Sequence, residues 1–420
     1  MFSIRTSRAV AAVMTAAACL AAASCSSASD SGATAPAGRS TDLGALLGPS
    51  NVATGAPIKI GLVHDGKTVG IDHTPNVDAF HATVQYANEH LGGLNGHKIE
   101  VEECSTNNTP SDATNCGVQM VQDGVAAVLV PVSAQDAAVY KAISGSGIPY
   151  ITYAAGAPEI IAAQDAFLLA NPIATLAAPA KIANQNGVKK AGIIIIDVPA
   201  ATAPLKSIAE PLYTKSGVEL SLIPISPQTA DMTPQIQQAI GDGVQQFSVI
   251  GTDEFNAQGI KTLKQLGYDG KIIMVTAPTK AVVDNVGDGG LDGVIYLTSA
   301  TSDPKDADVQ LYDAVMQTYA EDTTPTAQSA WSFALLMATI NALKGADAAV
   351  DGPSIAKAIS SMPTPLPLPL GAGLNYRCGA KVVSFLPSVC TDNALSTTLD
   401  AQGNGQSYQK LDVSEYMTMG

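Results

Sequence analysis

Short, mainly apolar runs that lack a regular polar alternation are separated by helical segments from Ile58 onward. The runs "IKIGLV" (58–63), "VAAVLV" (125–130) and "IPYIT" (148–152) are separated by stretches that carry an apolar helical face. A strand that is apolar throughout needs helices on both faces of its sheet, whereas an alternating strand exposes one face. The pattern therefore predicts an α/β fold built on parallel sheets.

The same pattern then restarts with "AGIIIID" (191–197) and continues with "VELSLI" (218–223), "FSVIG" (247–251), "KIIMV" (271–275) and "GVIYL" (293–297). Roughly 360 residues follow the N-terminal region, which is more than one hydrophobic core accommodates. We therefore predict two doubly wound lobes, bridged near "LLANP" (168–172).

The chain after residue 300 has a different character. Apolar stripes predict two helices between Val309 and Leu343. The stretch "MPTPLPLPLGAG" (362–373) is expected to be an irregular connection. The segments "KVVSFL" (381–386) and "SYQKLDV" (407–413) are predicted to be strands.

The N-terminus has the features of an export signal. Arg5 and Arg8 precede an apolar run, Ala9–Ala23, that is too short to span a bilayer. The ending "LAAASC" (20–25) is similar to the lipobox of bacterial lipoproteins, although it has Ala22 where a lipobox usually has Leu.

The lipobox-like ending predicts removal of residues 1–24 and lipidation of Cys25. Ordinary cleavage after an Ala-x-Ala site, with Cys25 left as an unused thiol, is the alternative. Residues 25–56 form a tract rich in Ser, Ala, Gly and Pro, which predicts a flexible tether.

The net charge argues against a nucleic-acid partner, and the cysteine spacing indicates disulfides. Removal of residues 1–24 takes away two arginines and no acids, which moves the formal net charge from −15 to −17. Such a chain has no basic patch to replace the counterions of a nucleic acid, so we expect no nucleic-acid partner. The close pairs Cys104/Cys116 and Cys378/Cys390 predict two disulfides in an exported protein.

Motifs for catalysis are missing from the sequence. It contains no G-x-S-x-G, H-E-x-x-H or phosphate-loop motif. The five histidines fall between His64 and His97 without the spacing of metal ligands. Adjacent acids such as Glu102 and Glu103 point to opposite faces of a strand and form no carboxylate pair. We expect no enzyme, no metal and no cofactor.

Five segments in fixed order carry a family resemblance: "IKIGLVHDG" (58–66), "ANEHLGGLNGHKIEV" (87–101), "QMVQDGVAAVLVPVSA" (119–134), "GIPYITYAAGAPE" (147–159) and "IKTLKQLGYDGKII" (260–273). Together they resemble the type I periplasmic binding proteins, specifically the branched-chain amino-acid (Leu/Ile/Val) binding type used by ABC importers. The resemblance covers roughly residues 58–343.

The resemblance implies two lobes joined by a three-strand hinge, with a small molecule enclosed between them. The crossovers are expected near Asn171, near Ser299 and in the proline-rich stretch. The first lobe is then 57–171 plus about 300–362, and the second is 172–299 plus about 363–420.

The same resemblance implies a monomeric, extracytoplasmic solute-binding lipoprotein of an ABC importer. Its partners are a small-molecule ligand and a membrane permease. Its only membrane contact is the lipid on Cys25, at the outer face of the bacterial cytoplasmic membrane. The alternative is a ligand-sensing receptor module of the same fold that reports to a signalling partner.

Ligand contacts in the first lobe are expected in the loops that follow its strands. Ser133, followed by Ala134, is expected to cap a helix or to donate to a ligand oxygen. The family's Ser-Pro-Ala-Ala-Thr turn is matched here by residues 152–156, so the backbone of Ala154 and Gly156 is expected to reach the ligand. Tyr153 either lines the cavity or packs between the lobes.

The first loop supplies one further candidate. His73 falls where the family has an aromatic wall, and either contacts the ligand or caps a helix at the surface. Asp65 and Lys67 in the same loop are charged candidates for ligand contact, and the expected alternative is that they are solvated loop residues.

The second lobe departs from the family at the matching positions Ala200, Thr252, Asp253, Thr276 and Ala277. The acid that pairs with a ligand ammonium in the family's amino-acid binders is missing. A buried ammonium without a carboxylate costs several kcal/mol, so either Asp253 or Glu254 supplies it or the ligand is not an α-amino acid. The ligand is expected to resemble a branched-chain amino acid, or to be a carboxylate or amide with an apolar tail.

Overall fold

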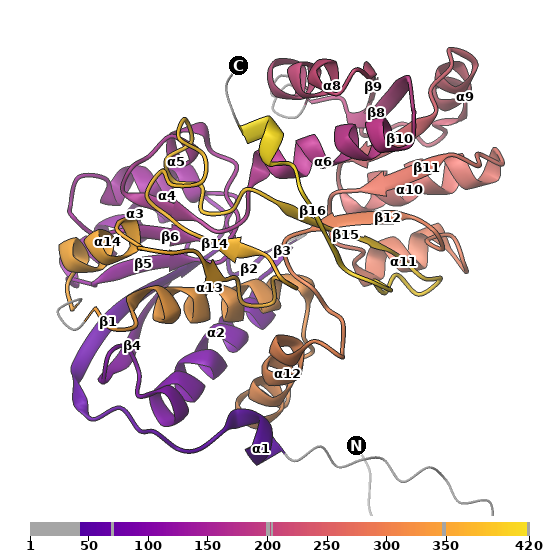
Figure 1. Cartoon of the computed structure of the whole chain (residues 1–420). Coiled ribbons are helices and arrows are strands. Elements are labelled where there is room, and N and C mark those ends of the chain that lie inside the picture. Colours follow the sequence, from indigo (N-terminus) through magenta and orange to yellow (C-terminus); the bar gives the residue numbers. More distant parts are fainter. Residues whose placement is uncertain (1–42, 69–70, 199–201, 203–204, 347–349, 418–420) are drawn as a thin grey trace, which may run out of the picture. The chain divides into compact units, whose positions relative to one another are not determined.

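The apolar runs form two sheets, each covered by helices (Figure 1). The structure, a computed structural model, describes residues 43–68, 71–198, 202, 205–346 and 350–417. The predicted fold class, two α/β lobes built on largely parallel sheets, is confirmed.

The first sheet has the order β4-β1-β5-β6-β7, and its paired strands are all parallel. Its strands are β1 (Gly55–His64), β4 (His97–Ser105), β5 (Ala127–Val130), β6 (Tyr150–Thr152) and β7 (Ala166–Leu168). Within β5, Leu129 belongs to one hydrophobic cluster, and its neighbours Val128 and Val130 belong to another on the opposite face. Two covered faces explain why the whole strand is apolar.

Helices from two separate stretches of the chain cover this first sheet. They are α2 (Thr74–Tyr86), η1 (Ala87–Leu91), α3 (Pro110–Gln122), α4 (Asp136–Ile143), α5 (Pro158–Ile161), α12 (Ala307–Tyr319), α13 (Ala327–Leu343) and α14 (Gly352–Ser360). Helix α13 is apolar nearly all round because it is buried among other elements of this lobe. Two short antiparallel strands, β2 (Lys67–Thr68) and β3 (Ile71–Asp72), follow β1.

The second sheet has the order β16-β15-β12-β11-β10-β8-β9. Its strands are β8 (Lys190–Ile196), β9 (Glu219–Ile225), β10 (Gln246–Ile250), β11 (Lys271–Met274), β12 (Ile295–Thr298), β15 (Ala394–Thr398) and β16 (Gln409–Leu411). The last two are antiparallel to their neighbours. The helices are α6 (Pro172–Gln185), η2 (Leu205–Ala209), α8 (Glu210–Lys215), α9 (Thr233–Gly241), α10 (Asp253–Gln265), α11 (Lys280–Val286) and η3 (Ser414–Met417).

The third crossover lies farther along the chain than expected. The proline-rich stretch and the short pair β13 (Leu366–Pro367) and β14 (Asn375–Tyr376) pack into the core of the first lobe. The Tyr376 hydroxyl donates to the Ala338 carbonyl of α13 at 2.6 Å. The chain then enters the second sheet at β15, so the expected boundary near residue 362 is corrected to the few residues before Ala394. Leucines between the prolines supply the apolar surface that holds this stretch on the first lobe.

Two further expectations are corrected. Residues 381–386 are not a strand: they form turns, with Val383 buried, between the two cysteines of a disulfide. Within the expected tether, helix α1 (Leu43–Leu47) buries Leu47 in the core of the first lobe, so the tether does not extend to residue 56. Its earlier part and Cys25 lie outside the described residues.

Both predicted disulfides are present. Cys104–Cys116 ties the end of β4 to α3, and Cys378–Cys390 closes the turn-rich segment before β15. In the described part of the chain, no helix is both long and apolar enough to cross a membrane.

We predict that replacing Cys104 and Cys116 together by Ser lowers the free energy of unfolding by about 3 kcal/mol, because a loop of this length regains its conformational freedom in the unfolded chain. Urea denaturation of the signal-free protein measures the loss. The matched variant C378S/C390S opens a loop with the same sequence separation of 12 and should lose a similar amount. An unchanged denaturation midpoint in both variants contradicts the prediction.

Candidate ligand-binding cavity

A cavity of about 970 Å³ is lined by loops at the carboxyl ends of strands from both sheets. His73 comes from the loop after β1, Ala154 from the loop after β6, and Thr252 from the loop after β10. The end of β12 and the first turns of α6 and α13 complete the lining. Loops that converge in this way are where open α/β sheets bind small molecules.

Six of the predicted contact residues line this cavity: His73, Ala154, Thr252, Asp253, Thr276 and Ala277. Four others, Ser133, Ala134, Tyr153 and Gly156, are not among the residues that line it. Ala200 lies outside the described residues.

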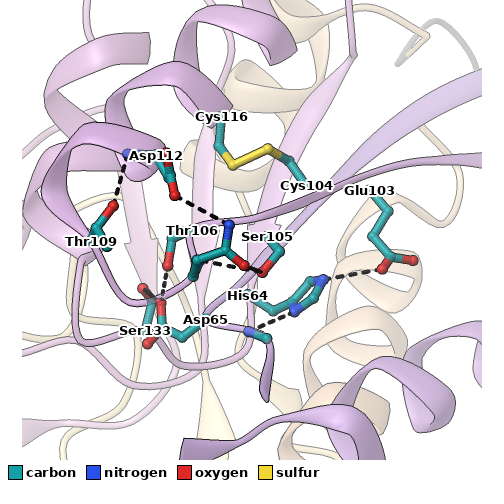
Figure 2. Close-up of a disulfide and its surroundings, with 12 residues drawn as sticks. His64, Asp65, Glu103, Cys104, Ser105, Thr106, Thr109, Asp112, Cys116 and Ser133 are labelled. Carbon is teal, nitrogen blue, oxygen red and sulfur yellow. Dashed lines mark hydrogen bonds and ion pairs between the residues drawn. A yellow bond between two sulfur atoms is a disulfide. The ribbon is translucent and has the colours of Figure 1, made fainter. Parts of the chain in front are cut away.

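Ser133 and Ala134 are occupied by a carboxylate of the chain itself. The Ser133 hydroxyl donates to Asp65 Oδ1 at 2.5 Å, and the Ala134 backbone N–H donates to Asp65 Oδ2 at 2.7 Å. Figure 2 shows Ser133 and Thr106 directed at Asp65, which is 0% exposed. The expectation that Asp65 is solvated is therefore wrong, because it follows a central strand and is enclosed by the loops after β4 and β5.

The backbone N–H of Gly156 is also hydrogen-bonded to a carboxylate of the chain. Its backbone N–H donates to Asp136 Oδ2 at 3.2 Å, and Asp136 is a buried residue at the start of α4. Burial raises the pKa of the Asp136 carboxyl. The donors of Ser133, Ala134 and Gly156 thus have partners within the chain, and none of the three residues is among those that line the cavity.

Tyr153 packs behind the cavity wall. Its ring is fully buried and stacks on Trp331, with ring centroids 5.3 Å apart and an interplanar angle of 14°. Trp331 itself lines the cavity, near the start of α13. Sequence reasoning did not single out Trp331, although it is the only tryptophan of the chain and lies in a predicted helix.

His73 is a buried wall residue. It stands at the N-cap position of α2 but makes no side-chain capping bond, so the expected alternative of a surface cap does not hold. Its Nδ1 accepts the backbone N–H of Asp65 at 3.3 Å, which leaves Nε2 as the protonated nitrogen of the neutral ring. Burial lowers the pKa of His73, and also that of its neighbour His64.

The second lobe contributes hydroxyls and acids. Thr252 caps α10, and Asp253 accepts the Thr279 hydroxyl at 2.5 Å. Glu254 lines the cavity beside Asp253, while the lining residue Asp72 on the other lobe is paired with Lys67 at 2.6 Å. The described lining residues include no Lys and no Arg, so this surface is formally negative.

The described residues contain no group of three or more His, Cys, Asp or Glu side chains that could hold a metal. The lining histidine, His73, bonds to a backbone N–H and not to a serine or cysteine. The arrangement is suited to enclosing a molecule and offers no activated nucleophile among the described lining residues.

We predict that the protein loses stability between pH 7 and pH 5. His64 and His73 have folded-state pKa values below their unfolded value of 6.5, so their contribution is present above that value and is lost as pH falls through the folded pKa. Thermal unfolding at several pH values measures the loss.

The variant H73N keeps an acceptor near the position of Nδ1 and should show a smaller loss over this range. The variant H81Q removes an exposed histidine and is the matched control. A pH dependence for H73N as steep as that of the unaltered protein contradicts the role of His73.

This architecture is shared with known proteins. The family model described as periplasmic binding protein matches residues 57–383. No curated protein sequence matches the chain.

Several solved structures share the fold. The leucine-, isoleucine-, valine-, threonine- and alanine-binding protein from Brucella ovis is 15% identical with a TM-score of 0.71, over 87% of this chain and 97% of that one. The substrate-binding protein LivJ from Streptococcus pneumoniae, solved with isoleucine, is 16% identical with a TM-score of 0.66, over 84% and 99%. A solute-binding protein from R. palustris, solved with benzoate, is 17% identical with a TM-score of 0.63, over 86% and 96%. On the family match, this chain belongs to the periplasmic binding protein family.

Proposed function

We propose that this protein is the solute-binding lipoprotein of an ABC importer. The observation that carries the proposal is the cavity lined by carboxyl-end loops of both sheets in a chain of this family. Such a protein encloses a small molecule between its lobes and delivers it to a membrane permease. The wall formed by Trp331 suits a molecule with an apolar part.

The proposed ligand is about the size of a branched-chain amino acid. It is either similar to one or a carboxylate or amide with an apolar tail. The related structures solved with isoleucine and with benzoate support this size and the apolar part. The proposed protein is a monomer, anchored by a lipid on Cys25 to the outer face of the bacterial cytoplasmic membrane.

Uptake measurements test the proposal. Deletion of the gene should abolish uptake of one labelled solute, and a plasmid copy should restore it. Unchanged uptake of every solute that the purified protein binds, together with an altered gene response to that solute, would instead identify a ligand-sensing receptor.

We predict that ligand binding changes the fluorescence of Trp331, which is the only tryptophan and lines the cavity. The variant W331A should bind the ligand at least about tenfold more weakly, because a large aromatic wall is lost. W331F keeps a ring, and calorimetry should show that it retains most of the affinity. Equal affinities for W331A and the unaltered protein contradict the placement of the ligand against this residue.

We predict that C25A moves the protein from the membrane fraction to the soluble extracytoplasmic fraction, because one cysteine carries the whole anchor. Fractionation followed by immunoblotting measures the distribution. The matched variant S27A alters the same segment and should stay with the membrane. Membrane retention of a C25A protein from which residues 1–24 have been removed, as checked by mass spectrometry, contradicts lipidation of this cysteine as the anchor.

A further inference from the structure

The carboxylate of Asp65 is held where three neighbouring strands of the first sheet end. Asp65 follows β1, which lies between β4 and β5 in the sheet. Thr106 follows β4 and donates its hydroxyl to Asp65 Oδ1 at 2.6 Å. Ser133 and Ala134 follow β5 and donate at 2.5 and 2.7 Å. One fully buried carboxylate therefore receives three donors from two loops.

The two hydroxyls are oriented in advance. The Thr106 oxygen accepts the backbone N–H of Asn108 at 3.1 Å, and the Ser133 oxygen accepts that of Gln135 at 3.0 Å. Each hydroxyl oxygen therefore accepts one hydrogen bond from a backbone N–H and donates its own proton to Asp65. Two hydroxyls and one N–H that converge on one point form a binding site for a carboxylate.

This filled site is one residue away from the cavity. The backbone N–H of Asp65 donates to His73, and His73 lines the cavity. On the same lobe, the Gly156 N–H is taken by the buried Asp136. Asp65 and Asp136 lie behind the lining residues, so a ligand carboxylate at this rim would lie close to two carboxylates of the chain. The described lining residues include no Lys or Arg to offset that repulsion.

We propose that Asp65 is a specificity determinant that fills a carboxylate subsite at the first-lobe rim, so that the cavity accepts only ligands without a carboxylate at that end. This inference rests on the proposed function. Of the ligands proposed there, it keeps the amide with an apolar tail, or a related neutral or cationic molecule. An α-amino acid is excluded.

Chemical rescue tests the subsite. The variant D65A lacks only the carboxylate group, which formate matches in size. D65A should melt about 5 °C or more below the unaltered protein, because three donors, two of them on the buried residues Thr106 and Ser133, lose their acceptor. Sodium formate should recover at least half of this loss in a saturable manner, compared with sodium chloride at equal ionic strength. Formate should not raise the melting temperature of the unaltered protein. It should not raise that of D65N either, because the Asn side chain fills the space.

The double variant D65A/S133A removes one donor and should lose most of the rescue. If D65A does not fold in chloride, its refolding yield is compared in the two salts, and recovery in formate alone supports the subsite. Equal behaviour of D65A in formate and chloride overturns the proposal, as does an equal formate response of D65N.

A second arm tests specificity with leucine as the probe, followed by Trp331 fluorescence. The unaltered protein should not respond, and D65A should give a saturable response at millimolar leucine. A fluorescence change of the unaltered protein at micromolar leucine overturns the proposal. The proposal is also overturned if leucine causes no fluorescence change in D65A although formate restores the stability of that variant. These outcomes are separate from those of the uptake experiment, which tests import for whatever solute the protein binds.

Discussion

The rest of the structure depends on both faces of each parallel sheet being covered by helices. Neighbouring residues of one strand then enter two different cores, as Ile193 and Ile194 do in β8. Such a sheet has no free face at which to bind a molecule. Only the strand ends remain, and the cavity lies at the carboxyl ends of the strands of both sheets, where the connecting loops converge.

The chemistry of those strand ends supports the proposal that the ligand is not an α-amino acid. Backbone and hydroxyl donors at the carboxyl end of a parallel sheet attract anions, and in the first lobe Asp65 and Asp136 already satisfy them. In the first lobe, His73 and Trp331 form a wall that faces the cavity, and Tyr153 stacks behind Trp331. The second lobe adds hydroxyls and the acids Asp253 and Glu254.

Much of this architecture was predictable from the sequence, because mainly apolar strands leave a local and repeated signal. The partners of Asp65 were not predictable, since its hydrogen bonds to Thr106 and Ser133 span 41 and 68 residues and depend on strand order. The third crossover was misplaced because proline content predicts irregular backbone but not the lobe on which it packs. The segment 381–386 has strand composition, yet it lies in turns closed by a disulfide.

The most direct measurement of the central claim is mass spectrometry of the signal-free protein under native conditions, followed by gentle denaturation to release and identify its ligand. The account predicts one small organic molecule per chain, with an apolar part and no carboxylate. A stoichiometric α-amino acid or another carboxylate would contradict it.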